Sequence, residues 1–284
     1  MASGMVWTVT LRQGISVHEA SAHIQAATPV LGPETVSLGD APGRVLAERL
    51  TSTRNLPPND CSAMDGYAVH SADLVHASEA RPVSLPVVEE IPAGRRSGME
   101  LPPGAAARIF TGAPVPPGAD AVVRQEDTRA EGDQVLVLIS PEPHANIRDA
   151  GEDIRDGENV LDVGTHLGAV EIGLLASLGR SMVRVHRRPR VAVLSSGNEL
   201  VEVDGDISGG RIVASNSYTL AAACKILGAE PLYLGISPDQ PESLERQFRA
   251  SLSADCIVSS AGVSVGDHDY VRPVLESLGC QLEF

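Results

Sequence analysis

Residues 189–200, PRVAVLSSGNEL, carry the pattern that decides the fold. An apolar run that follows a proline and opens into small polar residues is typical of a strand buried on both faces. Two more such strands are predicted at 232–235 and 256–260, and the segments between the three strands, 217–227 and 241–253, have helical patterns. This order of strands and helices predicts a parallel sheet with right-handed crossovers and with helices on both faces.

Two polar loops, 195–199 and 259–267, follow strands of this predicted sheet. Ligands of such sheets bind at the carboxyl ends of the strands, so both loops are expected at one edge. The second loop contains Ser260, glycines and other small residues, which let backbone N–H groups approach an anion closely. Carboxylates directly after it favour a bridging divalent metal such as Mg²⁺. A tight strand-to-helix turn with solvated caps is the alternative explanation.

Two acidic residues near this edge have competing explanations. Glu199 and its neighbour Asn198 can supply a metal ligand or hold a ribose or pterin hydroxyl, but a helix N-cap with an acidic first turn explains them equally well. Asp239 lies two residues before Pro241, which suits the first turn of a helix, so Asp239 is expected to cap that helix.

From residue 54 to about residue 143 the chain changes character. Short runs of β-forming residues, at 83–91, 108–109, 121–125 and 135–139, are separated by clusters of proline and glycine. This texture predicts a small β-domain.

Further helices are expected on both sides of that β-domain. Ser16 and Glu19 form a capping box, so a helix is predicted to start at about residue 17. Residues 170–178 are apolar at helical spacing and end at Gly179, which suits a helix C-terminus. Residues 43–50 are expected to form a shorter helix or a strand.

Composition narrows the class of protein. At 284 residues the chain can hold two or three domains, and with 43% hydrophobic but 3% aromatic residues their cores must be mainly aliphatic. The net charge of −15 argues against a general nucleic-acid-binding protein, which needs a positive surface. Four widely spaced cysteines indicate reduced thiols, and no apolar run is long enough to span a membrane. The expected location is the cytoplasm.

Three polar segments in and beside the β-domain are ambiguous on their own. Residues 59–68 read as a turn that leads into a strand, Thr111 is a hydroxyl beside a glycine turn, and residues 148–153 form a mixed-charge loop. The residue pattern alone makes none of them catalytic.

Five segments, spread over nearly the whole chain, match one family in the same order. They are PPNDCSAMDGYA at 57–68, IFTGA at 109–113, NIRDAGEDI at 146–154, SSGNEL at 195–200 and GVSVG at 262–266. Together they resemble the MoeA family, which includes the E domain of gephyrin. Five spaced matches in one order are far more specific than any single one.

The resemblance implies a multidomain α/β fold and an elongated homodimer. Its parts would be a parallel-sheet α/β molybdopterin-binding domain, an inserted small β-domain, an elongated connecting domain and a C-terminal β-barrel. The expected boundaries are 1–26 for an N-terminal helical segment that packs with the α/β domain, 27–49 with 146–178 for the connecting domain, 50–145 for the β-domain and 179–284 for the α/β domain.

The resemblance also implies a reaction. Adenylylated molybdopterin is cleaved in a step that depends on a divalent metal, expected to be Mg²⁺; AMP leaves, and molybdate is inserted at the dithiolene. Motif matching implies catalytic roles for Asp60, Thr111, Glu199, Asp239 and Asp269, and the last three are also the expected metal ligands. It implies substrate binding by Arg148, Asp153, Ser260, Gly262, Ser264 and Gly266.

Partners follow from the same resemblance. In the family, the regions that carry Asp60, Thr111, Arg148 and Asp153 face the α/β domain of the partner subunit, so the cleft would be shared in a homodimer. The molybdopterin adenylyltransferase is a further candidate partner, and neither nucleic acid nor membrane is expected.

The sequence departs from the family pattern in two places. Ala261 stands where the family usually has glycine, which narrows the anion-binding loop. In the family, a Lys-Pro-Gly-Lys-Pro segment helps hold molybdate and is followed by the C-terminal barrel. Neither has a counterpart in this sequence. The chain is therefore expected to be a truncated form that retains ligand binding but not catalysis.

Two other functions compete at this level. One is a non-catalytic pterin-binding or scaffold module, which would bind ligand without turnover. The other is a molybdopterin adenylyltransferase, which shares the α/β domain but lacks the inserted β-domain, and which would be supported by ATP-dependent adenylylation.

Overall fold

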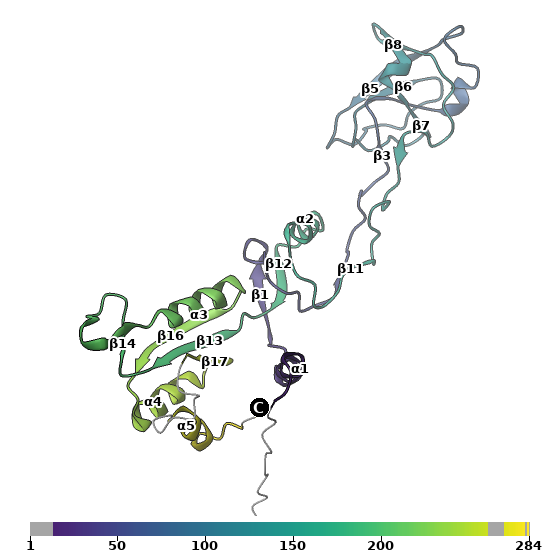
Figure 1. Cartoon of the computed structure of the whole chain (residues 1–284). Coiled ribbons are helices and arrows are strands. Elements are labelled where there is room, and N and C mark those ends of the chain that lie inside the picture. The colour runs from purple at the N-terminus through teal and green to yellow at the C-terminus, as the bar shows by residue number, and fades with distance from the viewer. Residues whose placement is uncertain (1–13, 261–269, 282, 284) are drawn as a thin grey trace, which may run out of the picture. The chain divides into compact units, whose positions relative to one another are not determined.

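The computed structural model describes residues 14–260, 270–281 and 283, and the chain divides into two compact units (Figure 1). The first, here called the α/β unit, comprises residues 1–47, 164–175 and 180–284. The second, here called the β unit, comprises residues 48–163 and 176–179. Each unit is described by itself.

A three-stranded parallel sheet forms the centre of the α/β unit. Strand β13 (Arg190–Ser196) lies between β16 (Glu230–Ser237) and β17 (Cys256–Ser259), and it pairs with both in parallel. Helix α3 (Ser215–Ile226) connects β13 to β16, and α4 (Pro241–Ser251) connects β16 to β17. The predicted parallel sheet and its two connecting helices are therefore confirmed.

Helices cover this sheet on two sides. Helix α3 packs on β13 and β16, whereas α4 and α5 (Val271–Ser277) lie on the other face (Figure 1). The second face buries Leu194, Leu244 and Phe248 against α5. Because β13 is covered on both faces, its residues from 191 to 196 are all buried, as expected for a central parallel strand.

The N-terminal part of the α/β unit begins with α1 (Val17–Ala27), which has the predicted capping box. Ser16 Oγ accepts a hydrogen bond from Glu19 N at 3.2 Å, and the Glu19 carboxylate accepts one from Ser16 N at 2.8 Å. Strand β1 (Pro33–Ser37) then pairs antiparallel with β12 (Met182–His186), a pairing that the sequence did not predict. The helix predicted at 170–178 is α2 (Ala169–Ser177).

The expectation of a helix or strand over 43–50 is wrong for most of that segment. The backbone of this segment pairs with two different segments in turn. It forms isolated bridges from Val45 to His166 and from Leu46 to Val185, and β2 (Leu50–Thr51) begins after them. The sequence also suggests that a strand starts near 281–284; of these residues the structure describes Gln281 and Glu283, and neither lies in a strand.

The β unit is built on a six-stranded sheet in the order β7-β4-β6-β5-β9-β8. Its two faces bury separate aliphatic clusters, one around Leu74 and Val137 and the other around Ile91 and Ile109. Strand β4 has no room for a side chain at Gly66, since a Cβ there would lie 1.9 Å from the carbonyl oxygen of Val123. The six strands are β4 (Gly66–Val69), β5 (Val83–Ile91), β6 (Ala106–Ile109), β7 (Ala121–Arg124), β8 (Thr128–Glu131) and β9 (Gln134–Val137).

Two short ladders complete the β unit. Strand β2 pairs with β11 (Asn159–Leu161), and β3 (Cys61–Ser62) pairs with β10 (Ile147–Arg148). The second ladder places residues 61–62 beside residues 147–148, which are distant in sequence, and thereby creates a polar site. No helix in the described ranges has the length and apolar character that crossing a membrane requires.

Candidate functional site

The carboxyl edge of the parallel sheet joins the loops that follow β13 and β16. Asn198 N donates to Asp239 Oδ2 at 3.3 Å, and Asp239 N donates to Asn198 Oδ1 at 3.3 Å. The prediction that Asp239 caps α4 is wrong: the N-cap is Gln240, without a side-chain capping bond. The Asp239 carboxylate instead turns back toward the loop after β13.

Glu199 lies on this same edge and borders a cavity. The alternative that Asn198 and Glu199 cap a helix is also wrong, because the chain passes from them directly into β14 (Leu200–Val201), which pairs with β15 (Ile212–Val213). No described residue forms a hydrogen bond or ion pair with the Glu199 carboxylate. This carboxylate is therefore available to a ligand.

The cavity has a volume of about 180 Å³, and its polar lining comes from three elements. Ser195 and Ser196 end β13, Ser215 and Asn216 begin α3, and Ser260 follows β17. The structure therefore brings Glu199 and Ser260 together, with Asp239 on the adjoining loop.

The metal site expected at this edge includes a residue that lies outside the described ranges. Within those ranges no three His, Cys, Asp or Glu side chains are close enough together to hold a metal ion. The expected third ligand, Asp269, and the expected substrate-binding residues Gly262, Ser264 and Gly266 fall outside them.

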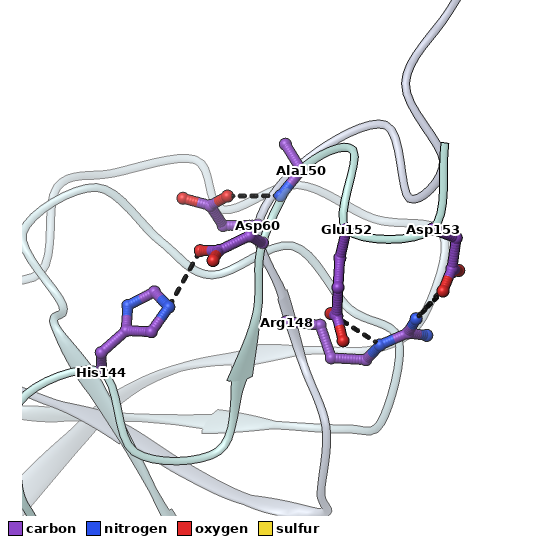
Figure 2. A network of polar contacts seen from close by, with 7 residues as sticks. Asp60, His144, Arg148, Ala150, Glu152 and Asp153 are labelled. Carbon is purple, nitrogen blue, oxygen red and sulfur yellow. Dashed lines mark hydrogen bonds and ion pairs between the residues drawn. The ribbon is translucent and has the colours of Figure 1, made fainter. Parts of the chain in front are cut away.

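A second polar site lies in the β unit, around Arg148. Its Nη2 atom donates to both carboxylate oxygens of Asp153 at 2.9 Å, and its Nε donates to Glu152 at 3.2 Å (Figure 2). The hydrogen bond to Asp153 is the main cause that raises the pKa of Arg148 above its usual value. The β3–β10 ladder positions this network, since Arg148 is the register partner of Cys61.

Asp60 belongs to the same network. Its Oδ1 accepts a hydrogen bond from Ala150 N at 2.8 Å (Figure 2), which ties the segment before β3 to the loop after β10. Asp60 and Ala150 also line a cavity of about 490 Å³ together with Arg96. The neighbouring Cys61 is buried, and burial raises the pKa of its thiol, so it is not an activated nucleophile.

Thr111 is fixed by a residue that sequence reasoning missed as a site residue. Both Thr111 N and Thr111 Oγ1 donate to Asp65 Oδ1 at 2.8 Å. These two hydrogen bonds, the backbone one first, lower the pKa of the Asp65 carboxyl. Gly112 N also donates to the carbonyl of Ser62 at 2.8 Å, so Thr111 belongs to the same junction of segments as Asp60. The only signal for Asp65 was its position before Gly66, which is equally typical of an ordinary turn.

The loop that leads into β10 has an unusual backbone. His144 and Asn146 have φ angles of +69° and +55°, which residues other than glycine seldom adopt. Asn146 Nδ2 donates to the carbonyl of Val122 at 2.8 Å, and His144 Nε2 lies 2.9 Å from Asp149 Oδ1 (Figure 2). Backbone strain held by surrounding contacts is common beside functional residues, and here it directly precedes Arg148.

Comparison with known protein families covers both units. The family described as MoeA N-terminal region (domain I and II) matches residues 15–179. The family described as probable molybdopterin binding domain matches residues 192–283.

Individual relatives agree with these matches. The chain is 48% identical over 250 residues to a molybdopterin molybdenumtransferase of Nostoc sp., covering 88% of this chain and 57% of that relative. It is 40% identical over 248 residues to a molybdopterin molybdenumtransferase of Haemophilus influenzae, covering 87% of this chain and 60% of that relative.

A solved structure is also similar. The crystal structure of the molybdopterin biosynthesis MoeA protein from Pyrococcus horikoshii aligns with a TM-score of 0.82 and 34% identity, covering 93% of this chain and 66% of that one. The chain thus spans less than two thirds of the length of each of these relatives.

Proposed function

This chain belongs to the MoeA family, and from that premise we propose that it inserts molybdenum into molybdopterin in molybdenum cofactor biosynthesis. The substrate would be adenylylated molybdopterin, and AMP would be the leaving group. The observation that carries the proposal is the carboxyl edge of the parallel sheet, where the Glu199 carboxylate, which has no partner among the described residues, borders a cavity shared with Ser260. This edge lies in the part of the chain that matches a molybdopterin binding domain.

The side chains at this edge suit a divalent cation. Mg²⁺ prefers oxygen ligands and is commonly held by one or two carboxylates together with substrate phosphates. Glu199 and Asp239 would supply such carboxylates, with Asp269 as the expected third. Bound there, Mg²⁺ would neutralise charge on the pyrophosphate.

In the β unit, Arg148 would bind an oxyanion such as molybdate or a phosphate. Asp153 and Glu152 hold two of its three guanidinium nitrogens, Nη2 and Nε. The third, Nη1, has no hydrogen-bond partner among the residues described. A guanidinium held in this way is pre-organised, so it loses little freedom when an anion binds.

Asp60 and Thr111 would present acceptor oxygens beside Arg148. Asp60 uses Oδ1 for Ala150 N, which leaves Oδ2 without a partner in the described part of the chain. Thr111 donates its hydroxyl hydrogen to Asp65, so its oxygen can only accept. We also propose a cytoplasmic homodimer in which these residues serve the α/β domain of the partner subunit, with the adenylyltransferase as a further partner.

The test is AMP release by the whole chain from adenylylated molybdopterin with Mg²⁺ and molybdate. Asp239→Asn should lower the rate at least tenfold, since it removes one charge from the cation site. Glu242→Gln is the matched control, because this exposed carboxylate lies three residues further on, in the first turn of α4.

The outcomes separate the competing functions. Equal rates for the Asp239 and Glu242 variants would refute the assignment of Asp239. Binding of molybdopterin without AMP release would support a non-catalytic module, and ATP-dependent adenylylation of molybdopterin would support an adenylyltransferase.

A further inference from the structure

The cavity of about 490 Å³ in the β unit combines apolar walls with a few polar groups. Its apolar lining consists of Pro58, Pro114, Val115 and Pro117. Val115 N donates to the carbonyl of Asp60 at 3.0 Å, so the apolar wall is joined directly to a polar residue of the same cavity. This volume and this mixture of groups are typical of sites that bind small organic molecules, which occupy roughly 300–1,000 Å³.

Arg96 and Asn59 supply hydrogen-bond donors to this cavity. Arg96 Nη2 donates to Asn59 Oδ1 at 2.6 Å, and Arg96 Nε and Nη1 have no hydrogen-bond partner among the residues described. A guanidinium can only donate, so the Asn59 atom that faces it must be the amide oxygen. The amide nitrogen, Asn59 Nδ2, is thereby left as a further donor, and it too has no partner in the described part of the chain.

The loop that carries Arg96 is held in place by Glu89 of β5. Ser97 Oγ donates to Glu89 Oε2, and Gly98 N donates to Glu89 Oε1 at 3.2 Å. These two hydrogen bonds, that of Ser97 first, lower the pKa of the Glu89 carboxyl, so it remains charged at neutral pH. Arg96 is therefore fixed through its side chain by Asn59 and through the following residues by Glu89.

Asp60 supplies an acceptor to the same cavity. Its Oδ1 accepts from Ala150 N at 2.8 Å (Figure 2), and its Oδ2 has no partner among the described residues. An ionised carboxylate can only accept. The donors at Arg96 and Asn59 and the acceptor at Asp60 are thus set by chemistry, and a ligand that satisfies both sides must offer a donor and an acceptor close together.

We propose that this cavity binds a flat nitrogen heterocycle in which an amino group adjoins a ring nitrogen. The amino group donates to Asp60 Oδ2, the ring nitrogen accepts from Arg96 or from Asn59 Nδ2, and the apolar wall packs against the ring. Both the adenine and the pterin of adenylylated molybdopterin have this pattern, so the inference rests on the proposed function for the identity of the ligand. Arg96 and Asn59 then determine which ring the site accepts.

Neutral probes test the pattern by calorimetry on the whole chain. Adenosine and pterin represent the two rings, and each is paired with the analogue in which oxygen replaces the amino group, inosine for adenosine and lumazine for pterin. The ring that belongs in the cavity should bind saturably, and its oxygen analogue should bind at least tenfold more weakly, because a carbonyl oxygen would face the acceptor of Asp60. In Asp60→Asn this preference should shrink, since an amide can turn its N–H toward the carbonyl.

Two neighbouring arginines provide a matched pair of variants. Arg96→Gln should weaken binding of the preferred ring at least tenfold, as expected for the loss of a hydrogen bond from a charged donor. Arg95→Gln removes the same charge one residue away and should leave binding unchanged, because Arg95 does not line the cavity and lies 3.5 Å from its partner Glu89. Both arginines are exposed, so both variants should fold.

Asn59→Asp separates ligand binding from a structural role of Asn59. The carboxylate still accepts from Arg96, but an acceptor replaces the Nδ2 donor. Binding of the preferred ring should therefore weaken, whereas a residue that merely held Arg96 in place would be replaced without loss.

Three results would overturn the inference: a wild-type chain that binds neither adenosine nor pterin saturably, equal affinity for each ring and its oxygen analogue, or equal effects of Arg96→Gln and Arg95→Gln. AMP release by the same wild-type protein tests the proposed function separately. Its absence together with the expected preference would refute molybdenum insertion but support the ring site. AMP release without any preference would refute the ring site alone.

Discussion

The two polar sites differ in how far the fold itself occupies their side chains. In the β unit, Arg148 is paired with Asp153 and Glu152, and Thr111 is tied to Asp65. At the carboxyl edge of the α/β unit, Glu199 has no partner among the described residues and faces a cavity. Side chains of the first kind stabilise the fold in addition to their proposed role in binding, whereas for Glu199 the proposed role is ligand binding alone. Substitutions should therefore separate stability from activity differently in the two units.

The largest effect is expected at the unpaired carboxylate. Glu199→Gln should lower AMP release about 100- to 1,000-fold, the range typical when a charged group that stabilises a transition state is lost. The melting temperature should change by less than about 2 °C, because the Glu199 carboxylate makes no hydrogen bond or ion pair within the described part of the chain. Kinetics and thermal unfolding of the same preparation check both parts. A large loss of stability would contradict the contrast between the units.

An intermediate effect is expected at the paired guanidinium. Arg148→Lys should raise KM for the substrate about tenfold, since an ammonium cannot reproduce the planar group that binds Asp153 through Nη2 and Glu152 through Nε and leaves Nη1 for an anion. The melting temperature should fall only slightly, because this ion pair is largely exposed.

A second arginine–aspartate pair of the β unit provides the control for Arg148. Arg124 pairs with Asp127 through its Nε and Nη2 atoms in the same β unit, so Arg124→Lys should disturb stability to a similar degree and leave KM unchanged. If both lysine variants raise KM alike, Arg148 has no specific role in binding.

The smallest effect is expected at Asp255, a carboxylate of the α/β unit that, unlike Glu199, has hydrogen-bond partners among the described residues. Hydrogen bonds from Arg187 and from Arg190 N lower the pKa of Asp255 to about 2, against an ordinary value of 3.8. A lowered pKa stabilises the folded state fully above the ordinary value, and this contribution is lost as pH falls from about 4 through about 2.

Asp255→Asn should therefore lower the free energy of unfolding by roughly 1 kcal/mol at pH 6 and by progressively less toward pH 2. Urea unfolding across this range measures the difference between the two proteins. A constant difference at every pH would show that the charge of Asp255 is not what stabilises the unit.

The predictability of the two sites from sequence also differs. The rule that parallel strands end at one edge was enough to place Glu199, Ser260 and Asp239 near one another, because one strand pattern fixes where all three loops lie. The detail of Asp239 was missed, since a residue near a helix start cannot show from sequence that its carboxylate turns toward Asn198 across the sheet edge.

The β-unit site could not be assembled from local patterns. Its segments around Asp60, Thr111 and Arg148 are far apart in sequence, and they are brought together by non-local contacts such as the β3–β10 ladder and the hydrogen bond of Gly112 N to Ser62. Non-local pairing of this kind leaves no periodic signal in any one segment. The family resemblance supplied these residues, and Asp65 and Glu152, which hold Thr111 and Arg148 in place, were not identified as site residues.

We propose that the carboxyl edge of the α/β unit holds a divalent cation together with a pyrophosphate. Mn²⁺, used in place of Mg²⁺, can be followed by electron paramagnetic resonance on the whole chain with inorganic pyrophosphate, for the wild type and for Glu199→Gln/Asp239→Asn. We expect pyrophosphate to tighten Mn²⁺ binding to the wild type, and the double variant to bind Mn²⁺ at least tenfold more weakly. Equal Mn²⁺ affinity of the two proteins in the presence of pyrophosphate would rule out a cation site formed by Glu199 and Asp239.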